Sequence, residues 1–174
     1  MSSKSLKRIG KRVCRKMPAL SADRSESIFV ENKQTQYPVD IESIKNAVAF
    51  VLDEEAVLAG EVTVSFVDLT AMTALNKQYR GIDEPTDVLS FSMTEKVDGE
   101  PVLLSAGAEE ILGDIVICPE IATENAAEFG HTPEREILEM TIHGLLHLLG
   151  HGHETTEKEA RMIARQEKLA GMIG

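Results

Sequence analysis

Residues 143–153 read HGLLHLLGHGH and hold four of the five histidines in the 174-residue chain. His143 and His147 are four residues apart, so on an α-helix both rings would lie on one face, about 6 Å apart along the axis. Pro133 suits the first turn of such a helix, with Thr132 as its N-cap. Apolar residues continue the pattern at positions 137, 138, 140, 142, 145, 146 and 149. This pattern predicts a largely buried helix over residues 133–149 that carries two neighbouring imidazoles.

Gly150 is suited to the left-handed turn that ends a helix, and His151 and His153 follow as candidates for a third ligand. On a continued helix His151 would lie about 12 Å along the axis from His143. Two nitrogens bound to one zinc ion cannot be more than about 4.2 Å apart. His153 can fold back after the glycine turn. We therefore expect His143, His147 and His153 to bind one metal ion, rather than to be histidines satisfied inside a core helix.

Three neutral imidazoles with a fourth position left to water are typical of catalytic zinc, although nickel and copper accept the same ligands. We expect one divalent ion, with Zn2+ as the first choice. Two other residues are candidates for supporting the site. Asp114 lies in the apolar run of residues 112–118, where an unpaired carboxylate is costly, so we expect it to face a partner such as a histidine ring. His151 either faces solvent or approaches the open position as an extra ligand or proton carrier.

The histidine spacing is also that of the metzincin proteases, H-E-x-x-H-x-x-G-x-x-H. Gly144 stands where those enzymes have their glutamate general base. Because the ligands are kept and the base is missing, peptide hydrolysis by that mechanism is disfavoured. A metalloprotease on a related scaffold is the first alternative function.

The motif H-G-x-L-H-L-x-G with a third histidine resembles that of the YbeY-type endoribonucleases, which act in rRNA maturation and ribosome quality control. Other stretches resemble the family's signatures: LNKQYRG at residues 75–81, TDVLSF at 86–91 and LGDI at 112–115. The likeness covers about residues 28–170. Where the family usually has Tyr-Asp before the third histidine, this chain has His151 and Gly152.

The resemblance implies metal-dependent cleavage of single-stranded RNA, with rRNA and ribosomal particles as partners. It also implies that Arg80 and His143 are catalytic. A guanidinium can hold a phosphate through two hydrogen bonds and offset its charge. Without the resemblance, Arg80 would be taken for a structural ion pair or a helix C-cap. A second alternative function is a non-catalytic ribosome assembly factor whose metal is structural.

The formal net charge of −11 is unevenly distributed. Residues 1–24 carry eight Lys or Arg and one acid, which gives +7, and the rest carry ten Lys or Arg and 28 acids, which gives −18. We expect a basic extension over residues 1–26, either an amphipathic helix or a disordered arm, and a metal-dependent hydrolase domain over residues 27–174. Because an acidic body binds phosphate poorly, RNA contacts would use a local basic patch or this extension.

The remaining patterns predict a single α+β domain. Short apolar or alternating runs predict strands near residues 28, 62, 88 and 113. Four or five helices are expected to cover this small mixed sheet, with a zincin-like metal helix among them and a closing helix over residues 154–169. No apolar run is long enough for a membrane span, and the two cysteines give no disulfide framework. A cytoplasmic protein without a membrane partner is therefore expected.

Overall fold

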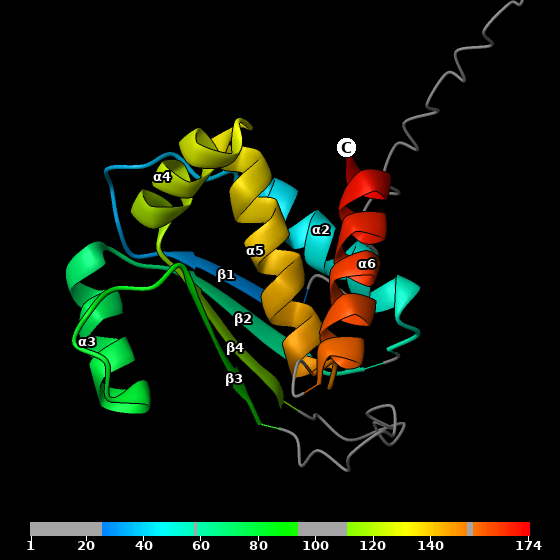
Figure 1. Ribbon diagram of the computed structural model, residues 1–174. Helices are drawn as coiled ribbons and strands as arrows, with labels where there is room; N and C mark the ends of the chain where they lie inside the picture. Colours follow the sequence, from blue (N-terminus) through cyan, green and yellow to red (C-terminus); the bar gives the residue numbers. More distant parts are fainter. Residues whose placement is uncertain (1–25, 58, 94–110, 153–154) are drawn as a thin grey trace, which may run out of the picture.

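The computed structural model describes residues 26–57, 59–93, 111–152 and 155–174. In this part of the chain, four strands and five helices form one small α+β domain (Figure 1), as expected from the sequence. Their order is β1 (Ile28–Asn32), α2 (Ile41–Glu54), β2 (Glu61–Phe66), α3 (Leu69–Arg80), β3 (Val88–Ser92), β4 (Ile111–Ile117), α4 (Pro119–Phe129), α5 (Pro133–Leu148) and α6 (Thr156–Ile173). The basic extension through residue 25 and the third predicted ligand, His153, lie outside the described residues.

The sheet is mixed, with the strand order β1-β2-β4-β3. Strands β1, β2 and β4 are parallel, and β3 pairs antiparallel with β4 at one edge. All four predicted strand positions are confirmed. The strand order is a further finding, because local sequence patterns identify strands more reliably than they identify neighbours.

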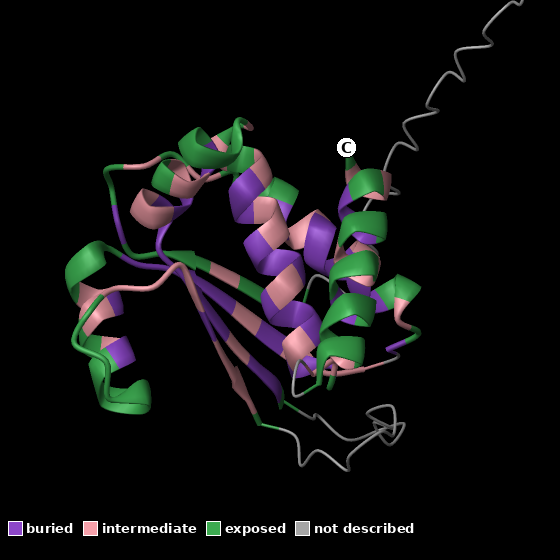
Figure 2. Cartoon of the chain, in the orientation of Figure 1, coloured by how far each residue is buried: buried purple, intermediate pink, exposed green. Residues whose placement is uncertain are grey.

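The two faces of the sheet bury different cores. Side chains alternate along β4, so Ile115 and Ile117 belong to the main core with α2, α5 and α6, whereas Val116 packs on the opposite side. There it joins Met72 of α3 and Leu89 of β3. Figure 1 shows α3 on that side of the sheet, away from α2, α5 and α6, and Figure 2 shows that buried residues recur along the length of α5. The predicted histidine helix is therefore the central helix of the main core.

Side-chain caps fix where several helices begin. The side chains of Asp40, Asp68, Thr132 and Thr155 each accept a hydrogen bond from a backbone N–H in the first turn of the helix that follows. Helix α5 matches the predicted helix to within one residue at its end, and α6 runs four residues further than the predicted closing helix. None of the described helices is both long and apolar enough to cross a membrane.

Candidate metal and active site

The end of α5 reverses the chain as the sequence predicts. Gly150 follows the helix with φ +87°, in the left-handed region. The N–H of His151 then donates to the carbonyl of Leu146 at 2.9 Å, and the N–H of Gly150 donates to that of His147 at 3.1 Å. These bonds satisfy carbonyls that the helix end would leave without partners.

The rings of His143 and His147 converge on the same side of α5. Their Nε2 atoms are 3.1 Å apart, and the ring centroids are 4.7 Å apart with an angle of 71° between the planes. Both residues are only partly buried. Because this separation is below the limit of about 4.2 Å for two nitrogens on one zinc ion, the pair fits a shared divalent cation.

The two histidines line a cavity of about 520 Å³. Helix α5 contributes Glu136, Glu139 and Met140 beside them, and Gln166 comes from α6. The opposite wall is formed by residues 86–90 and Ser92, at the start and along the edge of β3. Arg80, the last residue of α3, also lines the cavity and is the one Lys or Arg among its described lining residues. The structure thus brings Arg80 together with two of the predicted ligands.

His151 lies elsewhere, against α2. Its Nε2 is 2.9 Å from Oε2 of Glu55, whose Oε1 accepts from Nε of Arg165 at 2.6 Å. The hydrogen bond with His151 is the main cause that holds the pKa of Glu55 below its usual value, with Arg165 acting in the same direction. His151 is not among the described residues that line the cavity.

Asp114 is not brought to the histidine pair either. The neighbouring residue Ile115 points at α5, because a Cβ on Gly144 would be 2.8 Å from the Cγ2 atom of Ile115. Alternation along β4 therefore turns Asp114 to the other face of the sheet, beside its cross-strand partner Phe91. The structure gives no support for Asp114 as a partner of a ligand histidine.

Sequence reasoning missed Gln166 altogether. Its Oε1 lies 2.9 Å from Nδ1 of His143, the ring nitrogen that faces away from His147. No local pattern could have indicated this contact, because the two residues are 23 positions apart on different helices.

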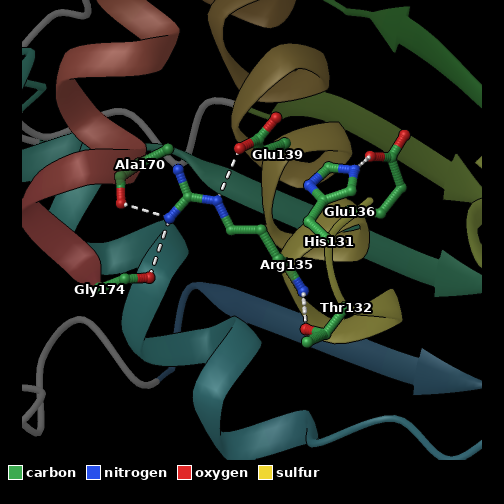
Figure 3. Close-up of polar contacts among 7 residues, drawn as sticks. All are labelled: His131, Thr132, Arg135, Glu136, Glu139, Ala170 and Gly174. Carbon is green, nitrogen blue, oxygen red and sulfur yellow. Dashed lines mark hydrogen bonds and ion pairs between the residues drawn. The ribbon is translucent and has the colours of Figure 1, made fainter. Parts of the chain in front are cut away.

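A second group of potential ligands was also missed. His131, Glu136 and Glu139 each offer one ligand atom, all within 4.8 Å of one another, and so could hold a metal ion. Nε2 of His131 is 2.8 Å from a carboxylate oxygen of Glu136, and Oε1 of Glu139 is 2.6 Å from Nε of Arg135. Figure 3 draws both contacts as dashed lines. Burial raises the pKa of Glu136, although His131 opposes the shift. The spacing 136, 139, 143, 147 is a helical stripe, and this signal could have revealed both carboxylates.

Comparison with known proteins decides the family. The family model described as Endoribonuclease YbeY matches residues 29–174. The chain belongs to this family. An endoribonuclease YbeY of Moorella thermoacetica is 41% identical over 150 residues, which cover 83% of this chain and 96% of that protein. One from Macrococcus caseolyticus is 46% identical over 123 residues, which cover 71% of this chain and 75% of the relative.

A solved structure agrees with the fold. The solution structure of TM1509 from Thermotoga maritima aligns with a TM-score of 0.61 at 33% identity, covering 84% of this chain and 88% of that one. The resemblance inferred from the histidine motif is confirmed, and so is the enzyme class, since the relatives are named as endoribonucleases, hydrolases that act on RNA.

Proposed function

We propose that this chain is a metal-dependent endoribonuclease that cleaves single-stranded RNA during rRNA maturation and ribosome quality control in the cytoplasm. The observation that carries the proposal is one cavity lined by His143, His147 and Arg80. Family membership supports RNA as the substrate, and the family's role, as implied by the sequence motifs, supports ribosomal particles as the partners.

The expected cation is a single Zn2+ held by His143, His147 and His153. The 3.1 Å between the first two Nε2 atoms and the all-imidazole donor set fit that ion. A divalent ion in this position would supply Lewis acidity, which polarises a phosphate and lowers the pKa of bound water. The group of His131, Glu136 and Glu139 is the competing location for an ion.

Arg80 is the residue we assign to the substrate phosphate. It is exposed at the end of α3, where the N–H of Gly81 already caps the helix by donating to the carbonyl of Lys77. The neighbouring ion pair at the turn joins Lys77 to Asp83 at 2.6 Å. Since other residues make the cap and the ion pair, the guanidinium is available to bind a phosphate through two hydrogen bonds.

The first test measures cleavage of single-stranded RNA. Treatment with a chelator should abolish cleavage and readdition of Zn2+ should restore it. Arg80→Gln should lower the rate by about 100-fold, the loss typical of removing one group that stabilises transition-state charge, without changing the metal content. The matched control is Arg161→Gln, which removes an exposed arginine from α6. Full activity without metal, or equal rates in the two variants, would contradict the proposal.

The second test assigns the ligands by elemental analysis of purified variants. His147→Ala and His153→Ala should lose the ion, whereas His151→Ala and His131→Ala should keep full stoichiometry. If His131→Ala lost the ion and His147→Ala kept it, the ion would instead be assigned to the group of His131, Glu136 and Glu139. Thermal melts of His147→Ala separate the remaining alternative: a folded, inactive variant supports catalysis, and an unfolded one supports an assembly factor with a structural metal.

A further inference from the structure

Gln166 makes a hydrogen bond that determines which ring nitrogen of His143 carries the hydrogen. The amide oxygen Oε1 lies 2.9 Å from Nδ1 of His143, and an amide oxygen can only accept. Nδ1 must therefore carry the hydrogen, and a neutral ring then has its lone pair on Nε2. That Nε2 is the atom 3.1 Å from Nε2 of His147. The hydrogen bond therefore leaves a lone pair, which can bind a metal ion, on the His143 nitrogen that faces His147.

Packing holds Gln166 in place. Met162, Leu169 and Ala170 share its side of α6 and are buried in the main core. Arg135 of α5 fixes the end of α6, because its Nη1 donates to the carbonyls of Ala170 and Gly174 at 3.0 and 2.9 Å (Figure 3). Gln166 is therefore presented to His143 by a docked helix.

A second anchor lies one residue before Gln166. Arg165 donates to Oε1 of Glu55 at 2.6 Å and to the carbonyl of Glu54 at 3.0 Å, which ties α6 to the end of α2. Helix α6 is thus fixed to α5 at its end and to α2 near its middle. The long, flexible glutamine side chain starts from a backbone that cannot shift freely.

We propose that Gln166 is a positioning residue: its Oε1 fixes His143 as the Nδ1–H tautomer and so presents Nε2 to the divalent cation. This inference rests on the proposed function, which supplies the cation. It adds Gln166 as the residue that orients the ligand His143. Partners of this kind raise ligand basicity and fix ring orientation, and their loss typically lowers metal affinity by 10- to 100-fold. The residue acts through His143 and needs no contact with RNA.

The test uses two substitutions at one position and a neighbouring control. Gln166→Met keeps a similar length and removes the acceptor, whereas Gln166→Glu keeps an oxygen that accepts. Glu167→Met changes the next, exposed residue of the same helix. Zinc affinity is measured on the full chain by competition with a chelator, without RNA. Gln166→Met should bind zinc about 10- to 100-fold more weakly, while Gln166→Glu and Glu167→Met should bind at least as tightly as the wild type.

A second readout reports the tautomer directly. Nitrogen-15 NMR of the metal-depleted protein, at a pH where the ring is neutral, should show the hydrogen of His143 on Nδ1, and a mixture of tautomers in Gln166→Met. A hydrogen on Nε2 in the wild type would overturn the inference, because Gln166 would then donate through its amide nitrogen. Wild-type affinity in Gln166→Met would also overturn it and leave the proposed function intact. Absence of zinc binding by the wild type would instead overturn the proposed function and, with it, the cation-presenting part of this inference.

Discussion

His151 illustrates how a residue beside a candidate metal site can serve the fold. From the sequence it was expected either to face solvent or to approach the open coordination position. The structure places it against Glu55, which also binds Arg165. One carboxylate thereby joins the turn after α5, the end of α2 and the middle of α6.

This carboxylate makes a pH-dependent contribution to stability. Its pKa lies below the reference value of 4.5, chiefly through the hydrogen bond with His151. Because the folded state favours the charged form, the contribution is complete above the unfolded pKa and is lost as the pH falls through the folded pKa. Glu55→Gln should therefore lower the free energy of unfolding by about 1–3 kcal/mol at neutral pH, and by less at about pH 4. Urea denaturation at both pH values measures the difference.

The control for this experiment is Glu157→Gln. Glu157 pairs with Arg161 at 2.9 Å, but both side chains are more than two-thirds exposed. Exposed ion pairs contribute little to stability, so this variant should unfold almost like the wild type at neutral pH. An equal loss in both variants, or a loss in Glu55→Gln that does not change with pH, would show that the ionised Glu55 and its partly buried contacts are not the cause.

Residue-level prediction from sequence succeeds where the partners are local. His143 and His147 lie on the same face of one helix, so their spacing in the sequence was enough to predict that they are neighbours. Glu55 and His151 are 96 positions apart, and Gln166 contacts His143 from another helix. Such contacts depend on how helices dock, and no spacing rule encodes them. Asp114 shows the limit of local patterns. The apolar run around it indicated that its carboxylate needs a partner, but the face of the sheet on which it lies depends on the register of β4.

At the level of elements, the contact between α5 and the sheet explains the glycine in the histidine motif. A Cβ on Gly144 would lie 2.8 Å from Cγ2 of Ile115 and 2.9 Å from Oγ of Ser90. The helix therefore approaches β3 and β4 too closely for a side chain. The position that carries the general base in metzincin proteases has no room for glutamate here, which gives a structural reason to disfavour the protease alternative.

Gly144→Ala should test this close approach. The added methyl group must displace Ile115 or Ser90, and overpacking of this kind typically costs about 1–3 kcal/mol. Gly171→Ala in α6 is the control, because a Cβ added there would meet nothing within 4 Å. Replacing a helical glycine there should change stability little or raise it by up to about 1 kcal/mol. Chemical denaturation compares the two, and equal stabilities would contradict the packing argument.

Element identity was largely readable from the sequence. Short apolar or alternating runs located all four strands, and helical periodicity with an N-cap located α5 to within a residue at its end. The order β1-β2-β4-β3 was not readable, because the partners of β4 come from residues 61–66 on one side and 88–92 on the other. The cavity wall formed by β3 depends on that order.

At the level of the whole molecule, the start of the chain and the rest of it carry opposite net charges. The first 24 residues carry +7 and the remainder carries −18. If the basic extension captures RNA, deleting residues 1–24 should weaken binding most at low salt, because fewer counterions are then released. Binding to single-stranded RNA measured over a range of salt concentrations gives the slope. An unchanged slope would favour a passive extension.

The docking of α6 ties the site to the fold in another way. If Gln166 orients a ligand histidine, a bound cation and a docked α6 must stabilise one another by the same free energy. Amide hydrogens of α6 should then exchange with solvent more slowly as metal is added, while those of the central strands change less. A molecule short of metal would therefore expose the amides of its last helix more often than those of its sheet. Removing the cation would thus loosen α6 as well as stop cleavage, while the domain stays folded.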